Sequence, residues 1–289
     1  MRTWLAGYEM RRVVTLDDAL RVLADAPRAW TPFAGGTDLM VLLEAGRLPN
    51  QRFLNLWNLD ELRGIAVTDM SVRLGALTTY SDVLAHPVLH AEFTLLGEAA
   101  RETGAIAIQN RGTIGGNIAN ASPAADTPPA LLVYDAVIHV ASVRGRRAIP
   151  YAAFHTGYKT MDLAADELIT AVELPRRPAG WVEAYRKVGT RRAQAISKVC
   201  FAAALDVDPE SRRVREARVA VGSVAPTVLR CVATEATVRG RSIDDQTIAA
   251  ARTALAAEIA PIDDIRSTAR YRRLVAGNLL EAFLRDHMK

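Results

Sequence analysis

The sequence predicts a protein of mixed helices and strands in two domains. The chain has 289 residues, and domains commonly hold about 100–200 residues. Short apolar runs with the two-residue period of strands alternate with runs that have the 3.6-residue period of helices. Pro175-Arg-Arg-Pro178 interrupts both patterns. We therefore expect a domain boundary close to this segment.

The first part of the chain predicts alternating elements. Thr15-Leu-Asp-Asp18 resembles a capping box, so a helix should begin there and end near Pro27. Residues 109–129 have little helical periodicity and are rich in small and polar residues, which favours a functional loop. Apolar alternation and glycine breaks predict the remaining elements, namely strands at 31–34, 53–57, 72–76, 137–142 and 168–174 and helices at 39–45, 81–90 and 93–103.

After the proline-rich segment, three strands should precede two helices. The strands are expected at 183–188, 196–207 and 217–224, and the helices at 247–260 and from Arg270. Cys200 lies in an apolar strand pattern and should be a buried hydrophobic residue. The last helix is amphipathic, with one face expected to carry Tyr271, Leu274, Val275, Leu279, Ala282 and Phe283.

Composition excludes several classes of protein. The formal charge is only +4, and the basic clusters are scattered, unlike the dense surface of a nucleic-acid-binding protein. No apolar run approaches the roughly 18 residues that a membrane-spanning helix needs. The N-terminus reaches Glu9 and Arg11 before a signal-peptide core could form, so we expect a cytoplasmic protein. His86 and His90 lack an evident third ligand, so no metal site is expected.

The two cysteines, Cys200 and Cys231, limit the redox chemistry of the chain. Iron–sulfur clusters are commonly held by four cysteine thiolates. A redox centre used by this protein must therefore be a bound organic cofactor or belong to another chain.

The sharpest local motif is Phe33-Ala-Gly-Gly-Thr-Asp-Leu39, in which a strand enters two glycines and then a helix. Glycines let backbone N–H groups approach an anion closely, and Thr37 offers another donor. An ordinary strand-to-helix turn, with Thr37 or Asp38 as the N-cap residue, is the alternative interpretation.

A second paired-glycine motif, Thr113-Ile-Gly-Gly-Asn117, precedes Ala121-Ser-Pro and Asp126. Two such loops suit a ligand with two phosphates, clamped between subdomains, better than two coincidental turns. Neither loop matches the dinucleotide fingerprint G-x-G-x-x-G or the P-loop. This argues against a doubly wound nucleotide-binding fold and against an ATPase.

These motifs resemble a known family. The two glycine motifs, the segment Asp166-Glu-Leu-Ile-Thr-Ala-Val-Glu-Leu-Pro175, and the later motifs Tyr185-Arg-Lys-Val-Gly-Thr-Arg-Arg192 and Tyr271-Arg-Arg-Leu are similar to the FAD-binding medium subunit of molybdenum hydroxylases. This is the family of xanthine dehydrogenase and aerobic carbon monoxide dehydrogenase. The similarity runs from the first strand to the last helix.

The resemblance implies an α+β fold. The expected FAD-binding domain, 1–176, is a two-subdomain unit of the vanillyl-alcohol-oxidase (PCMH) type divided near residue 58. Residues 177–289 would form a smaller C-terminal α+β domain of the carbon monoxide dehydrogenase flavoprotein type. By the same similarity, residues near the FAD are Phe33, Ala34, Gly35, Gly36, Thr37, Asp38, Leu39, Thr113, Ile114, Gly115, Gly116, Asn117, Asp126, Ile169 and Lys187. No catalytic acid or base is assigned.

The implied function is electron transfer in a heterotrimeric unit. A large partner subunit would carry molybdenum–pterin and a small one two two-iron, two-sulfur clusters, with electrons passing through FAD to an acceptor such as NAD or a quinone. The glycine loops lack the His or Cys used for covalent attachment, so the FAD should be noncovalent. A bulky residue at Gly115 or Gly116 should then prevent FAD retention and leave the fold largely intact.

Four alternatives remain open from the sequence. The chain could be a self-sufficient flavin oxidoreductase of the same superfold, or a non-catalytic nucleotide-binding module. Lys187 could be a solvated charge on an edge strand, since lysine is normally exposed. Arg186 could also take its place beside the flavin after a one-residue shift.

Overall fold

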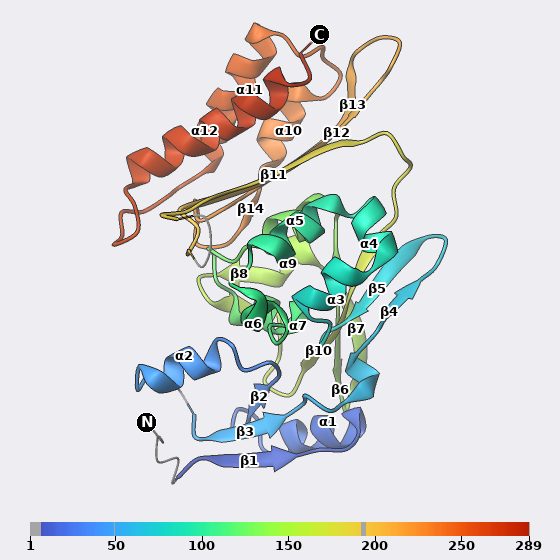
Figure 1. Cartoon of the computed structure of the whole chain (residues 1–289), viewed down its shortest axis with the longest axis vertical. Coiled ribbons are helices and arrows are strands. Elements are labelled where there is room, and N and C mark those ends of the chain that lie inside the picture. Colours follow the sequence, from blue (N-terminus) through green and yellow to red (C-terminus); the bar gives the residue numbers. More distant parts are fainter. Residues whose placement is uncertain (1–6, 49, 192–194, 289) are drawn as a thin grey trace.

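The computed structural model describes residues 7–48, 50–191 and 195–288 and has three layers along its long axis (Figure 1). The N-terminal layer is a parallel sheet in the order β1-β3-β2, accompanied by two helices. Its elements are β1 (Glu9–Arg12), α1 (Leu16–Asp25), β2 (Thr31–Phe33), α2 (Leu39–Glu44) and β3 (Arg52–Asn55).

The middle layer is an antiparallel sheet in the order β4-β5-β10-β6-β7 with helices packed on one face. Its strands are β4 (Ile65–Val67), β5 (Ser71–Gly75), β6 (Val137–Ser142), β7 (Gly145–Pro150) and β10 (Leu168–Pro175). The helices of this layer are η1 (Asp60–Leu62), α3 (Tyr80–Ala85), α4 (Pro87–Glu92), α5 (Thr94–Glu102), α6 (Ile106–Gln109), α7 (Ile114–Asn120), α8 (Pro128–Val133) and α9 (Tyr151–Phe154). A small hairpin, β8 (His155–Gly157) and β9 (Thr160–Met161), projects from it.

The C-terminal layer is an antiparallel sheet in the order β11-β12-β13-β14, covered by three helices on its outer face (Figure 1). Its elements are β11 (Val182–Val188), β12 (Val199–Val207), β13 (Val214–Gly222), β14 (Leu229–Arg230), α10 (Val232–Val238), α11 (Asp245–Glu258) and α12 (Ala269–Arg285).

Strand β12 is buried on both faces. Phe201 and Leu205 pack against the outer helices, whereas Cys200 and Ala202 pack against the helices of the middle layer. This explains why the strand is a nearly continuous apolar run without alternation. Cys200 is fully buried, which confirms the expectation for this residue.

An aspartate at the end of α8 holds the C-terminal sheet to the middle layer. Asp135 pairs with Arg177 of the proline-rich segment and with Arg218 and Arg230 of the C-terminal sheet. Burial opposes its ionisation, but the hydrogen bonds and charge of Arg230 and Arg218 outweigh burial and lower the pKa of Asp135. The junction between the layers is therefore charged as well as apolar.

Most predicted elements are present, and three expectations are wrong. The single helix at 81–90 is two helices, because the chain is extended at His86 before Pro87, and Thr79 rather than Ser81 caps the first. The segment 109–129 contains α7 and the first two residues of α8, and both helices are too short to show a helical period.

The third correction concerns α12. Tyr271 and Leu274 are exposed, at 40% and 55% of their areas, so they do not share the buried face. That face centres on Ala276 and Leu280, and it includes Arg272, whose guanidinium pairs with Asp264. A buried arginine interrupts the apolar pattern that predicted the other face.

No helix in the described part of the chain has the length and apolar character needed to cross a lipid bilayer.

Candidate functional site

The first glycine loop connects β2 to α2 and is shaped by a close backbone contact. Gly36 has a φ of 77°, a left-handed conformation that glycine adopts without strain. A Cβ built on Gly35 would lie 1.7 Å from the carbonyl oxygen of Arg111, just before the second glycine loop. The glycine at position 35 is therefore required because two backbone segments meet there.

The backbone N–H groups of this loop are available to a ligand. Within the part of the chain that the structure describes, the amides of Gly35, Gly36, Thr37 and Asp38 have no hydrogen-bond partner. Asp38 is the N-cap residue of α2, but its side chain makes no cap hydrogen bond. The ordinary turn with a side-chain cap is thus not what forms here, and several donors remain free for an anion.

The second glycine loop is more self-contained. Thr113 caps α7, and its hydroxyl accepts a hydrogen bond from the Gly116 amide at 3.1 Å. The Gly115 amide donates to the carbonyl of Ala76 at 2.9 Å, and a Cβ on Gly115 would lie 2.7 Å from the Ala76 side chain. Gly115 is therefore a packing residue, so the expectation that a bulky side chain there leaves the fold intact is wrong.

The structure brings the two glycine loops together. Besides the contact between Gly35 and Arg111, the Asn120 amide at the end of α7 donates to the Asp38 carboxylate at 3.2 Å. Figure 1 shows α2 of the N-terminal layer lying below α6 and α7 of the middle layer. Loops that are distant in sequence thus lie side by side where the first two layers meet.

A stacked aromatic residue supports this contact. Two guanidinium groups lie over the Trp57 ring, that of Arg111 at 3.8 Å and that of Arg63 at 4.5 Å from the ring centroid. Arg63 also donates to the Trp57 carbonyl. Stacking of this kind stabilises by about 0.5–2 kcal/mol and fixes Arg111, whose carbonyl faces Gly35. This role of Trp57 was not predicted, because Trp57 is far from Arg111 in the chain.

Asp126 lies in a buried polar cluster. Its Oδ2 accepts a hydrogen bond from Lys187 at 2.7 Å, and its Oδ1 accepts one from Ser197 at 2.7 Å. Burial raises the pKa of Asp126 above its usual range, although the Lys187 ammonium opposes the shift. The next residue, Thr127, donates to the Asn117 side chain at 2.7 Å, which links the cluster to α7.

Lys187 is not a solvated residue. Its side chain is only 6% exposed, and its ammonium also donates to the carbonyl of Glu102 at 2.8 Å. Strand β11 is an edge strand, as expected, but Lys187 points toward the middle layer. Arg186 is exposed and donates to the Tyr185 carbonyl instead. Lys187 is therefore the residue of this pair that reaches Asp126. Arg192 of the same motif lies outside the described residues.

Ile169, Asp126 and Lys187 are the remaining residues that were expected near the cofactor. Ile169 is buried in β10 beside an irregular register, and the carbonyl of the next residue, Thr170, accepts from the Ala76 amide. Ile169 is thus close to the Ala76 segment that receives Gly115. Among the described residues, no hydrogen bond joins Asp126 or Lys187 to residues 33–39.

Two further residues contact α7, which follows the second glycine loop, and were not expected. The ammonium of Lys159, at the tip of the β8–β9 hairpin, donates to the side-chain carbonyl of Asn120 at 3.2 Å. At the base of the same hairpin, His155 Nε2 donates to the Ile118 carbonyl of α7 at 2.9 Å. No motif signalled these contacts, since they depend on how the hairpin folds back over α7.

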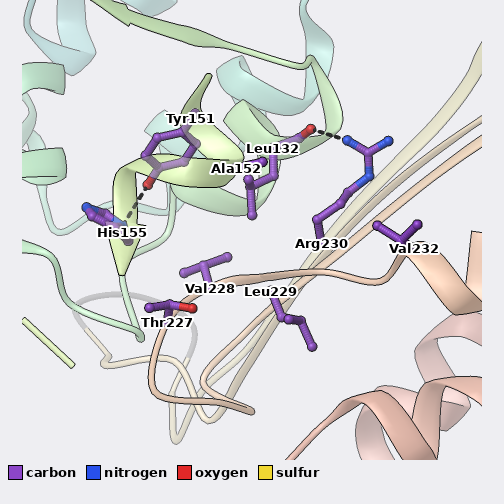
Figure 2. A pocket seen from close by; sticks show the side chains of 9 residues that line it. All are labelled: Leu132, Tyr151, Ala152, His155, Thr227, Val228, Leu229, Arg230 and Val232. Atoms are coloured by element: carbon purple, nitrogen blue, oxygen red, sulfur yellow. Dashed lines mark hydrogen bonds between the residues drawn. The ribbon is translucent and has the colours of Figure 1, made fainter. Parts of the chain in front are cut away.

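A separate pocket of about 240 Å³ lies where the middle layer meets the C-terminal sheet (Figure 2). Tyr151 and His155 line one side, and Val228, Leu229 and Arg230 line the other. The Arg230 guanidinium donates to the Leu132 carbonyl at 2.9 Å and is directed away from His155. Neither glycine loop contributes to this pocket.

Comparison with protein families gives two matches that together span most of the chain. Residues 6–177 match the model of the FAD binding domain in molybdopterin dehydrogenase. Residues 183–287 match the model of the CO dehydrogenase flavoprotein C-terminal domain.

Individual relatives agree with these matches. The chain is 34% identical over 265 residues to the putative xanthine dehydrogenase FAD-binding subunit of Escherichia coli strain K12, covering 90% of this chain and 89% of the relative. A structure of carbon monoxide dehydrogenase from Hydrogenophaga pseudoflava superposes with a TM-score of 0.91 at 28% identity, covering 95% of both chains. Quinoline 2-oxidoreductase from Pseudomonas putida 86 gives a TM-score of 0.88 at 25% identity, with 97% and 96% covered.

Proposed function

The chain belongs to the family of FAD-binding subunits of molybdopterin dehydrogenases, and we propose that it is the electron-transfer subunit of a molybdenum hydroxylase. Family membership confirms the resemblance found in the sequence and identifies an oxidoreductase subunit. Its FAD would be held noncovalently between the two glycine loops. The observation that carries this proposal is the contact of Gly35 with Arg111, which sets four unpaired amides beside the second loop.

The first glycine loop would provide most of the diphosphate contacts. Its amides, from Gly35 to Asp38, and the Thr37 hydroxyl are donors, and backbone N–H groups in such a loop favour an anion. The second loop, Thr113 to Asn117, would form the opposing wall, because the Gly115 and Gly116 amides already have partners. The missing side chains of Gly35 and Gly115 let these two loops pack closely on Arg111 and Ala76, which would hold the walls of the proposed site in place.

The other residues would position the rest of the cofactor. Asp126 would lie near the ribose or adenosine portion, and Ile169 and Lys187 near the flavin. Because the carboxylate of Asp126 is already held by Lys187 and Ser197, it would keep a fixed orientation toward a ribose hydroxyl. FAD, when bound, would supply the acceptance and release of one or two electrons. The protein's part is to bind and orient it and to exclude water.

The partners would carry the metal centres. We propose a large molybdenum–pterin subunit and a small subunit with two two-iron, two-sulfur clusters, followed by an external acceptor such as NAD or a quinone. In support, the chain has only two cysteines, and both are fully buried. An iron–sulfur cluster shared with a partner subunit would need exposed cysteines. A relative in Hydrogenophaga pseudoflava, 27% identical, is named the medium chain of carbon monoxide dehydrogenase.

We further propose that the FAD-binding domain is of the PCMH type and comprises residues 1–176. Its subdomains would divide near residue 58, and residues 177–289 would form the C-terminal domain. The three separate sheets support this division, since β3 ends at Asn55, β10 at Pro175 and β11 begins at Val182. The family matches, at 6–177 and 183–287, lie within one or a few residues of the same boundary.

The test is to purify the full chain and record its absorbance, then titrate it with FAD. We expect the absorbance bands of a flavin, and we expect heat or acid to release that flavin from the protein. The chain should also copurify with chains that contain molybdenum and iron. A colourless chain that does not bind added FAD would contradict the proposal and favour a nucleotide-binding module. Reduction of the flavin by an organic substrate without partner chains would instead favour a self-sufficient oxidoreductase.

A further inference from the structure

The tip of the β8–β9 hairpin places a lysine in an unfavourable backbone conformation. Lys159 has a φ of 53°, in the left-handed region, which costs a non-glycine residue roughly 1–2 kcal/mol. Gly157 stands two residues earlier and pairs with Thr160 across the hairpin. A turn that would suit glycine at position 159 thus carries a long cationic side chain. A strained residue of this kind is a reason to look for a function.

The hairpin is fixed to α7 at both of its ends. At the base, His155 Nε2 lies 2.9 Å from the carbonyl oxygen of Ile118. At the tip, Lys159 Nζ lies 3.2 Å from Oδ1 of Asn120. The helix α7 begins at the second glycine loop, so these two contacts set the position of the lysine relative to that loop.

Asn120 extends the connection to the first glycine loop. While its Oδ1 accepts from Lys159, its Nδ2 donates to the Asp38 carboxylate at 3.2 Å. Asp38 is exposed and follows directly on the free amides of Gly35 and Gly36. A carboxylate at this position repels a phosphate group, and a nearby ammonium offsets that repulsion.

The lysine also has unused donor capacity. An ammonium group has three hydrogens, and within the described residues Lys159 makes one hydrogen bond, to Asn120. The other basic side chain tied to the loops, Arg111, is stacked on the Trp57 ring. Lys159 is therefore the cation that can turn toward an anion between the loops without losing a packed position.

We propose that Lys159 is a positioning residue for the diphosphate of a bound dinucleotide, supplying the positive charge that the glycine loops lack. This inference rests on the proposed function, because it takes the ligand to lie between those loops. The role is electrostatic, since the side chain is exposed and its distance to the loops is set through Asn120. Its effect should therefore depend on ionic strength.

The experiment measures the FAD dissociation constant of the full chain by fluorescence titration. The variants are Lys159→Gln, Lys159→Arg and the control Arg146→Gln. Arg146 is exposed, and its side chain makes no hydrogen bond or ion pair among the described residues. The control thus removes the same charge elsewhere. Each is measured at about 0.01 M salt, where charges act over about 30 Å, and at about 1 M, where they act over about 3 Å.

At low salt we expect Lys159→Gln to raise the FAD dissociation constant about tenfold, because the variant loses one hydrogen bond between charged groups. Lys159→Arg and Arg146→Gln should bind like the parent, and the loss in Lys159→Gln should shrink at high salt. An unchanged constant in Lys159→Gln would overturn the inference. An equal loss of FAD affinity at both salt concentrations, together with a lower melting temperature, would also overturn it. That result would indicate that Lys159 only stabilises the β8–β9 hairpin. A parent chain that binds no FAD would instead overturn the proposed function, and this inference with it.

Discussion

The ammonium of Lys187 lies 2.7 Å from Oδ2 of Asp126, and the two side chains are only 6% and 12% exposed. Lys187 belongs to the first strand of the C-terminal sheet, whereas Asp126 follows the second glycine loop. The buried pair therefore joins the C-terminal layer to the segment expected to contact the cofactor. Any motion of one layer relative to the other must carry or break this pair.

Replacing Lys187 with methionine should destabilise the chain by about 3 kcal/mol, because the substitution leaves the Asp126 carboxylate buried without its cation. Ser197→Ala, which removes one neutral donor, should cost about 1 kcal/mol. Denaturant unfolding of the parent and each variant gives these values. The double variant Asp126→Asn, Lys187→Met should lose less than the sum of the single losses. Additive losses would show that the two residues do not act as a pair.

Gly35→Ala should abolish or severely weaken FAD binding, because even a methyl group would lie 1.7 Å from the Arg111 carbonyl and force the loops apart. Gly97→Ala is the matched control. Gly97 lies within α5, and a Cβ there meets nothing within 4 Å. The control should bind FAD normally and gain about 0.5–1 kcal/mol in unfolding free energy. FAD titration and thermal unfolding of both variants make the comparison. Normal FAD affinity in Gly35→Ala would show that the loops are not closely apposed.

The stability of the chain should fall as the pH drops from about 7 toward 5.5. Burial lowers the pKa of His155, whose ring donates to the Ile118 carbonyl, and burial also lowers the pKa of His287. The unfolded chain takes up protons below pH 6.5 while the folded chain does not, so acid favours unfolding in this window. Denaturant unfolding at several pH values measures the slope. His155→Asn should reduce the slope and leave the His287 portion. An identical slope in that variant would show that His155 does not titrate as its burial indicates.

Both cysteine thiols should be unreactive in the folded chain. Cys200 and Cys231 are fully buried, and burial raises the pKa of each thiol well above its usual range. The thiolate is the reactive form, so a thiol reagent at mildly alkaline pH should modify neither residue until denaturant is added. Rapid modification of one thiol per native chain would show that one of these residues is accessible.

The sequence was sufficient for features that depend on local pattern. The capped helix α1 and three strands of the central sheet, β5, β6 and β10, followed from apolar periodicity, whereas β4 and β7 did not. The glycine loops were recognised as special because paired glycines let backbone N–H groups approach an anion. What periodicity cannot supply is the partner of each side chain. Lysine is a residue type that is normally exposed on a strand, and only the packing of β11 against the middle layer buries Lys187.

Short elements and surface contacts were also beyond the sequence. The hairpin β8–β9 has strands too short for an alternating pattern, so neither it nor Lys159 was expected at the glycine loops. Gly115 is expected near the cofactor from the family resemblance, but the sequence did not reveal that its amide donates to the Ala76 carbonyl. Paired glycines can thus mark a loop with free amides and a loop whose amides are already paired.

Strand β12 has an implication for shortened forms of the protein. Because Cys200 and Ala202 complete the core of the middle layer, a chain ending near residue 177 would expose the apolar surface that Phe93 and Tyr134 help to form. Such a fragment should aggregate, and its melting should not resemble that of the intact chain. The segments 6–177 and 183–287, which match separate family models, share the apolar interface on β12. Neither segment is therefore expected to melt independently of the other.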